Sequence, residues 1–229
     1  MDADGIAQAA SYMPVFPLIG AGVGLAAGVV VWTLRLILPS LVTGMVGLGC
    51  LVLLNGAQHT DGLLDFGDGI MYHGSAKEKL RIMDDPTTGA GGFSLGLIIL
   101  SATAFSIAAL PQTMIVPVMV ASESAANYSM VLATGVSKSA HKGMNTVFVE
   151  AMRSRRLSRL ILSLIILVTI SLFALGIIGI AVTVGAILTG AGMAAITKRQ
   201  FGGITGDVMG AANEISRLVS LLIILVFLK

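Results

Sequence analysis

Long apolar runs, each close to the length that crosses a lipid bilayer, follow one another along most of this chain. A bilayer-spanning helix needs roughly 20 predominantly apolar residues. The runs therefore predict about seven transmembrane helices, at 16–38, 39–57, 92–111, 113–134, 158–177, 179–196 and 214–228. Almost no loop separates the third run from the fourth or the fifth from the sixth, which predicts two tight transmembrane hairpins. The expected fold is all-α, a polytopic integral membrane helical bundle that forms a single domain over residues 1–229.

Composition excludes a soluble domain. Hydrophobic residues make up 55% of the chain and charged residues only 11%, with a mean hydropathy of +0.94, whereas a globular chain carries about 25% charged residues. The single cysteine, Cys50, lies in an apolar run, so neither a disulfide nor a cysteine metal site is expected. The first apolar segment is expected to stay as a membrane span, because Asp2 and Asp4 precede it and no basic residue does.

The basic residues divide unevenly between the two ends of the predicted bundle. One end carries the N-terminus and the loops 58–91, 135–157 and 197–213. Its basic residues are Lys77, Lys79, Arg81, Lys138, Lys142, Arg153, Arg155, Arg156, Lys198 and Arg199. The other end has only Arg35 and Lys229. The positive-inside rule therefore predicts a cell-membrane protein whose N-terminus and long loops face the cytoplasm.

A polar stripe interrupts the apolar pattern after the second run. Its members are spaced three or four residues apart, which places them on one face of a helix: Asn55, Gln58, Asp61, Asp65 and Asp68. Carboxylates beside lipid are costly and mark a functional site by default, and Mg²⁺ prefers carboxylate oxygen and water. The stripe therefore predicts a divalent metal site for a phosphate-bearing substrate. A solvated helix end capped by Asp is the alternative, and His59 is either a ligand, an acid–base group or a hydrogen-bonded histidine.

Two further segments fall at the same predicted end. In the first, Asp84 and Asp85 precede a Pro turn and a Gly-rich stretch up to Gly92, which predicts a loop that completes a metal–phosphate site. An ordinary Asp-Pro turn before a membrane helix is the alternative. In the second, Gly203, Thr205 and Asp207 resemble a nest able to wrap an anion.

Polar residues also occur inside or at the start of apolar runs. Asn213 and Glu214 are expected at the start of the last span, and Glu123 and Asn127 lie four residues apart within the fourth. Such residues either bind substrate in a hydrophilic cavity or bridge to a partner helix.

Together these segments resemble the cobalamin synthase family, the adenosylcobinamide-GDP ribazoletransferases of vitamin B12 assembly. The resemblance rests on three blocks and an opening Phe16-Pro17-Leu18-Ile19-Gly20. The blocks are His59-x-Asp61-Gly62-x-x-Asp65-x-x-Asp68-Gly69, Ile82-Met83-x-Asp85 with Gly89, and Gly203-x-Thr205-Gly206-Asp207-x-x-Gly210-Ala211-x-Asn213-Glu214. They follow one another in the family's order along nearly the whole chain.

The resemblance implies a Mg²⁺-dependent transfer at the membrane. The 3′-hydroxyl of α-ribazole, or of its 5′-phosphate, would attack the phosphate on the cobinamide of adenosylcobinamide-GDP, and GMP would leave. We expect Asp61, Asp65 and Asp85 to hold metal, with Asp68 and Asp84 as further ligands, and Asp68 or His59 to accept the proton. Many members have an Arg where this chain has Thr87 and Thr88, and another at Asn127. Lys138, Lys142 or Arg81 would then contact phosphate instead.

Two other protein classes share some of these features. A CDP-alcohol phosphotransferase-like lipid enzyme also uses spaced Asp residues at helix ends, but its Asp-Gly-x-x-Ala-Arg run is absent after Asp61. A cation transporter would carry carboxylates near mid-membrane in both halves of the chain. Membrane lipid is an expected partner, a homo-oligomer is possible, and no nucleic-acid partner is expected.

Overall fold

The computed structural model describes residues 3–141 and 143–229, without the side chains of Ala3, Asp4 and Met144. Lys142, one of the expected phosphate contacts, lies outside the described residues. Helices account for nearly all of the regular structure, and the described residues contain no strand beyond a single bridge between Ser139 and Ile204. The all-α expectation is confirmed.

Within the described part of the chain, six helices are long and apolar enough to cross a membrane by themselves. They are α2 (Phe16–Leu34, extended by the 3-10 turn Met13–Val15), α6 (Ala90–Ala109), α7 (Ile115–Val136, preceded by the 3-10 turn Gln112–Met114), α9 (Arg156–Leu175), α10 (Ile178–Gln200) and α11 (Gly206–Phe227). A seventh span is possible if α3 (Ser40–Leu54) and α4 (Gln58–Met71) are counted together, although a 96° bend separates them. About seven spans were expected. The described residues contain six, or seven if the bent pair α3 and α4 is counted as one span.

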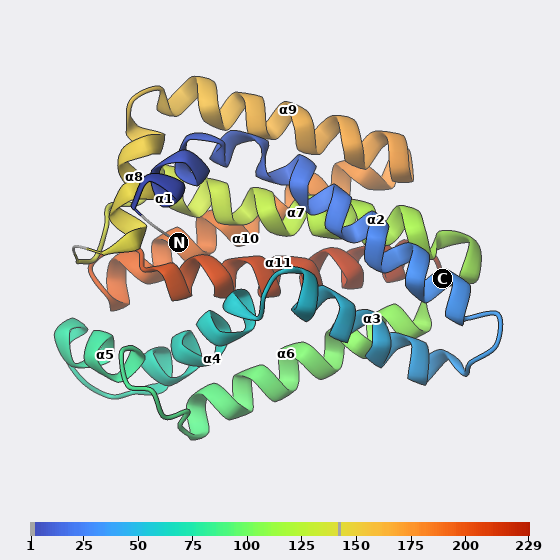
Figure 1. The fold of residues 1–229 in the computed structure, drawn as a ribbon, viewed down its shortest axis with the longest axis horizontal. Coiled ribbons are helices and arrows are strands. Elements are labelled where there is room, and N and C mark those ends of the chain that lie inside the picture. The colour runs from blue at the N-terminus through green and yellow to red at the C-terminus, as the bar shows by residue number, and fades with distance from the viewer. Residues whose placement is uncertain (1–2, 142) are drawn as a thin grey trace.

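Helix α7 forms the centre of the bundle. It packs against α2, α9, α10 and α11 (Figure 1), and 78% of its most apolar window is buried. Small residues make this packing possible: a Cβ added at Gly28 of α2 would lie 3.2 Å from the Met119 Cβ of α7. Ser129 of α7 also donates to the Ala186 carbonyl of α10 at 2.8 Å and contacts Ser216 of α11. Close backbones and interhelical hydrogen bonds replace the hydrophobic effect as the source of helix association in lipid.

One of the two expected hairpins is wrong. Helices α9 and α10 do pack against each other after a turn at Gly176, but α6 and α7 diverge after their short connection. Helix α6 instead packs against α3, α4 and α11 (Figure 1). A short loop fixes only where the next helix begins. The position of α6 is set by the glycines that allow it to approach α4 closely.

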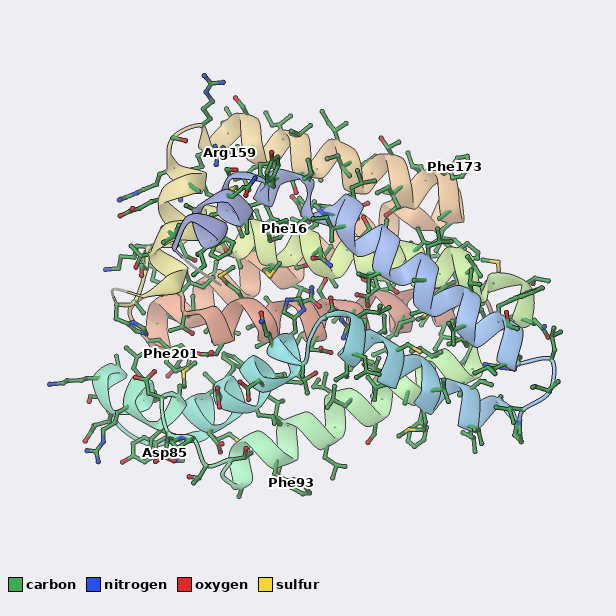
Figure 2. All side chains as sticks on the ribbon, viewed as in Figure 1. Phe16, Asp85, Phe93, Arg159, Phe173 and Phe201 are labelled. Carbon is green, nitrogen blue, oxygen red and sulfur yellow. The ribbon has the colours of Figure 1, made fainter. Side chains whose placement is uncertain are left out.

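The outer surface and the two ends of the bundle differ in character. Large apolar side chains face outward along the spans, among them Phe173 of α9, which is 95% exposed (Figure 2). The short helices α1 (Ala3–Ser11), α5 (Ala76–Met83) and α8 (Met144–Arg153) lie at the end of the bundle away from the C-terminus (Figure 1). All three sequence motifs reach this same end, which we call the motif end.

Candidate active site

The break between α3 and α4 turns the polar stripe of α4 toward the motif end. Gly56 and Ala57 have φ values of 73° and 60°, the left-handed conformation that ends one helix and redirects the chain. Asn55 belongs to the end of α3, where its side-chain amide donates to the Leu51 carbonyl at 3.0 Å. The expectation that Asn55 extends the stripe is therefore wrong. The other four members, Gln58 to Asp68, do lie on α4.

Five carboxylates from three elements gather beside α4. The charge of Asp65 interacts with those of Asp61 and Asp68 on α4, of Asp84 at the end of α5, and of Asp207 at the start of α11. Asp207 in turn interacts with Asp84 and Asp61. We call these five residues the acidic cluster. Since like charges repel, this arrangement favours a cation or a proton among them.

Helix α5 is held in place so that Asp84 can join the acidic cluster. Its first turn has a capping box, in which the Ser75 hydroxyl accepts from the Glu78 N–H and the Glu78 carboxylate accepts from the Ser75 N–H at 2.8 Å. Lys79, which is 8% exposed, donates to the Gln200 side chain at 2.6 Å and so ties α5 to the end of α10. Asp84 follows directly as the C-cap residue.

Asp85 lies apart from the acidic cluster. It is exposed at the motif end (Figure 2), and its Oδ1 accepts from both the backbone N–H of Thr87, at 2.9 Å, and the Thr87 hydroxyl. These hydrogen bonds, helped by the positive charge of Arg81, lower the pKa of Asp85 below its ordinary value. Asp85, expected as a metal ligand, therefore stabilises the turn that follows α5.

Asp68 caps the N-terminus of α6. Its two carboxylate oxygens accept from the N–H groups of Gly89 at 2.7 Å and Gly92 at 2.8 Å. A Cβ at Gly89 would lie 2.6 Å from Asp68 Oδ1, so glycine is needed for this approach. A carboxylate at a helix N-terminus is favourable because it meets unpaired N–H groups and the positive end of the dipole. These N–H groups were expected to face phosphate; in the structure they bind Asp68.

The third motif begins a helix instead of forming a free loop. Helix α11 starts at Gly206, well before the expected residue 214, and Thr205 caps it by accepting from the Val208 N–H at 3.2 Å. Gly203 faces a neighbouring chain segment, since a Cβ there would lie 2.6 Å from the Lys138 carbonyl oxygen. The expected anion nest around Gly203 is therefore filled by protein backbone, and Asp207 turns to the acidic cluster.

Two glycines bring α4 and α11 into contact. A Cβ at Gly62 would lie 2.7 Å from the Asp207 Cα, and one at Gly210 would lie 2.9 Å from the His59 Cα. This close crossing is what places Asp207 beside Asp61 and Asp65, far from them in sequence. The glycines of the first and third motifs thus act through helix packing.

A buried ion cluster lies deeper in the bundle, between α7 and α11. The Arg217 guanidinium binds the carboxylates of Glu123 and Glu214 and donates to the Asn213 side chain at 3.0 Å. Arg217 and Glu123 are 0% exposed and Glu214 is 1% exposed. Glu123 therefore bridges to a partner helix, which was one of the two alternatives for it. Asn127 donates to the Glu123 carbonyl at 3.0 Å, within its own helix.

His59 lies between the two groups of charges. It is half-buried, lies beside Asn213 and close to the Arg217 charge, and precedes Asp61 of the acidic cluster by two residues. Neither His59 Nδ1 nor Asn213 Nδ2 has a hydrogen-bond partner among the described residues. The neighbouring Thr60 hydroxyl donates to Glu214 at 3.4 Å, which links α4 to the ion cluster. Unsatisfied buried polar atoms call for an explanation, and a catalytic role for His59 is one.

The model of one protein family, described as cobalamin-5-phosphate synthase, matches residues 2–225. The chain belongs to this family. A relative in Methanocella arvoryzae named adenosylcobinamide-GDP ribazoletransferase is 34% identical over 218 residues, covering 86% of this chain and 79% of that protein. Relatives of the same name in Methanosarcina mazei and Shewanella frigidimarina are 27% and 29% identical, over 99% and 98% of this chain and 86% of each relative. No solved structure matches the chain.

Membership of the cobalamin-5-phosphate synthase family confirms the resemblance carried by the three sequence blocks. It also decides against the lipid phosphotransferase and the cation transporter. Within the site, Arg217 is the residue to which sequence reasoning assigned no role. Its spacing of three and four residues from Glu214 and Asn213 was a usable signal, because a lone Arg in an apolar helix needs a counter-charge.

The ligand atoms that the acidic cluster offers are of the type that Mg²⁺ prefers. Its members offer only carboxylate oxygens, and Asp61 and Asp84 are exposed to solvent. Mg²⁺ usually keeps several waters and is held by one or two carboxylates together with substrate phosphate. No three metal-ligating side chains of the described residues converge on one point. The cluster therefore suits a hydrated ion better than a closed protein cage.

Proposed function

We propose that this chain is a ribazoletransferase that joins the phosphocobinamide part of adenosylcobinamide-GDP to α-ribazole or its 5′-phosphate. The observation that supports it is the acidic cluster, in which carboxylates of the first and third family blocks, together with Asp84 beside the second, lie near one another on a member of the cobalamin-5-phosphate synthase family. The products are adenosylcobalamin, or its 5′-phosphate, and GMP. The reaction belongs to the last steps of cobalamin biosynthesis.

The proposed step is a displacement at phosphorus. The 3′-hydroxyl oxygen of the ribazole forms a bond to the phosphorus that carries the cobinamide. The bond from that phosphorus to the bridging oxygen breaks, and GMP leaves with the electron pair. The hydroxyl proton passes to a base on the protein. Such a reaction needs positioning and charge neutralisation, and it needs no covalent nucleophile.

The chain's own residues divide this work in the proposal. Asp61 and Asp65 would hold Mg²⁺, with Asp84 and Asp207 beside them, and the ion would neutralise charge on the diphosphate. Asp68 would keep α6 against α4, and Asp85 would shape the turn after α5. His59, whose Nδ1 has no hydrogen-bond partner among the described residues, would accept the proton.

We further propose that the motif end faces the cytoplasm of the cell membrane. The support is the excess of Lys and Arg at this end, which the positive-inside rule places on the cytoplasmic side. A site at the end of the bundle lets soluble substrates enter, while the surrounding helices limit water, which would compete with the ribazole hydroxyl.

The test is product analysis with purified full-length protein, adenosylcobinamide-GDP and Mg²⁺. With either α-ribazole or its 5′-phosphate present, we expect one GMP for each corrinoid joined. Comparing the two acceptors identifies the preferred one, and a chelator should stop turnover. GMP released at the same rate without any ribazole would show a hydrolase and contradict the proposal. Full turnover in the chelator would contradict the magnesium requirement.

A further inference from the structure

A cavity of about 240 Å³ opens at the motif end, and none of the five residues of the acidic cluster lines it. Four cationic side chains from separate parts of the chain line it: Lys138, Arg153, Arg156 and Lys198. We call it the basic cavity. Its described lining residues include no carboxylate, so these positive charges repel one another unless an anion lies among them.

Local contacts explain why some of these cationic side chains are present, but they do not explain why all four point into one cavity. Arg156 donates to the Gly135 carbonyl near the end of α7, and Lys198 lies in the last turn of α10. Cations near helix C-termini are favourable because they meet the negative end of the dipole. Each of these contacts could be made with the side chains spread apart over the surface. Instead they face one hollow.

The four cationic side chains provide hydrogen-bond donors suited to phosphate oxygens. A guanidinium can offer two parallel N–H groups to one phosphate, and an ammonium offers a compact positive charge.

The basic cavity borders the lipid-facing surface of the bundle. Val136 and Ala194 contribute apolar atoms to its lining. Leu157 of α9, which directly follows Arg156 of the cavity lining, is 72% exposed. Only 17% of the apolar window of α9 is buried, so its outer face is free to contact acyl chains. Phosphate-binding charge and acyl-chain surface therefore meet at one place.

We propose that the basic cavity binds the phosphate group of an anionic phospholipid, whose acyl chains run along the outer faces of α9 and α10. Basic pockets between transmembrane helices are well suited to anionic headgroups. The site is separate from the acidic cluster, and the proposal does not depend on the reaction proposed above. A soluble nucleotide phosphate has the same chemistry and is distinguished by the test.

The test measures lipid binding to the purified full-length protein in detergent by native mass spectrometry. The probes are phosphatidylglycerol and phosphatidylcholine with matched acyl chains, and the variant is Arg153→Gln/Lys198→Gln. Arg156 is left intact because it holds the end of α7. Removing two cations should weaken phosphatidylglycerol binding by about 30-fold, at about 1 kcal/mol for each. Phosphatidylcholine should bind weakly to both proteins.

The matched control is Arg155→Gln/Arg199→Gln, which removes the same charge from exposed neighbours that do not line the cavity. It should keep the parent affinity for phosphatidylglycerol. Equal losses in both pairs would show general surface attraction and overturn the proposal. GMP or inorganic phosphate is then added in competition with the lipid. Displacement of phosphatidylglycerol from the parent protein by GMP would assign the cavity to nucleotide phosphate and overturn the lipid assignment.

Discussion

Replacing Arg217 by Met tests whether the buried ion cluster holds α7 to α11. The guanidinium is 0% exposed and compensates two carboxylates, Glu123 and Glu214, that are themselves almost completely buried. Met fills much of the volume of Arg but brings no charge. The variant therefore leaves two negative charges in the bundle without a partner.

The expected loss of stability follows from this geometry. Breaking a buried ion pair by removing one partner costs about 3–5 kcal/mol, because the remaining charge stays desolvated. For a chain of this length, 1 kcal/mol corresponds to roughly 2–4 °C in Tm. We therefore expect Arg217→Met to lower Tm by about 6–20 °C.

The single cysteine provides the assay. Cys50 lies partly buried in α3, so a thiol-reactive fluorophore reports its exposure as the purified protein unfolds on heating. Arg199→Met, at an exposed position near the end of α10, is the matched control and should leave Tm unchanged. Adding Glu123→Gln and Glu214→Gln to Arg217→Met should restore most of the loss, because none of these three buried positions then carries a charge. An Arg217→Met protein as stable as the parent would refute the structural role of the ion cluster.

Three further perturbations test the packing of the site and its orientation. Gly62→Ala places a Cβ against the backbone of α11 and should lower the free energy of unfolding by about 1–3 kcal/mol. Gly49→Ala is the control, because nothing lies within 4 Å of its added Cβ, and it should leave the free energy of unfolding unchanged. Equal effects of the two variants would contradict the close crossing of α4 and α11. Asp68→Asn replaces one acceptor by a donor facing a glycine N–H and should cost about 1–2 kcal/mol in the same unfolding assay; parent-like stability would count against the cap. On a background lacking the native cysteine, a cysteine at exposed position Ser75 should resist an impermeant label in intact cells, while one at Ile177 should react; the reverse pattern would invert the orientation.

The sequence was sufficient to predict the class of fold and most members of the acidic cluster. Apolar runs located the spans because a bilayer requires their length, and helical spacing placed Asp61, Asp65 and Asp68 on one helix. The kink at Gly56 and Ala57 was not predictable from hydropathy, since Ala57 gives no sign of a left-handed conformation. That kink is what removes Asn55 from the stripe.

The remaining features of the site depend on tertiary contacts, which the sequence alone does not show. The sequence could not show that Gly62 meets Asp207, or that Arg217 meets Glu123, because both contacts join segments distant in the chain. The Gly-rich stretch before α6 was interpreted through its freedom to approach phosphate. In the structure the same freedom lets Gly89 approach the carboxylate of Asp68. Glycine indicated a close approach, but it could not identify the partner.

The most direct test of the central claim is the rate of GMP formation from adenosylcobinamide-GDP and α-ribazole 5′-phosphate by three proteins: the parent, Asp65→Asn and Asp85→Asn. Asp65 is central to the acidic cluster and Asp85 lies outside it. At saturating Mg²⁺, Asp65→Asn should lose turnover by about 100-fold or more, with Tm unchanged or raised because repulsion is relieved. Asp85→Asn should keep most of the activity. Parent-like turnover by Asp65→Asn, or an equal loss in Asp85→Asn, would contradict the assignment of the reaction to the acidic cluster.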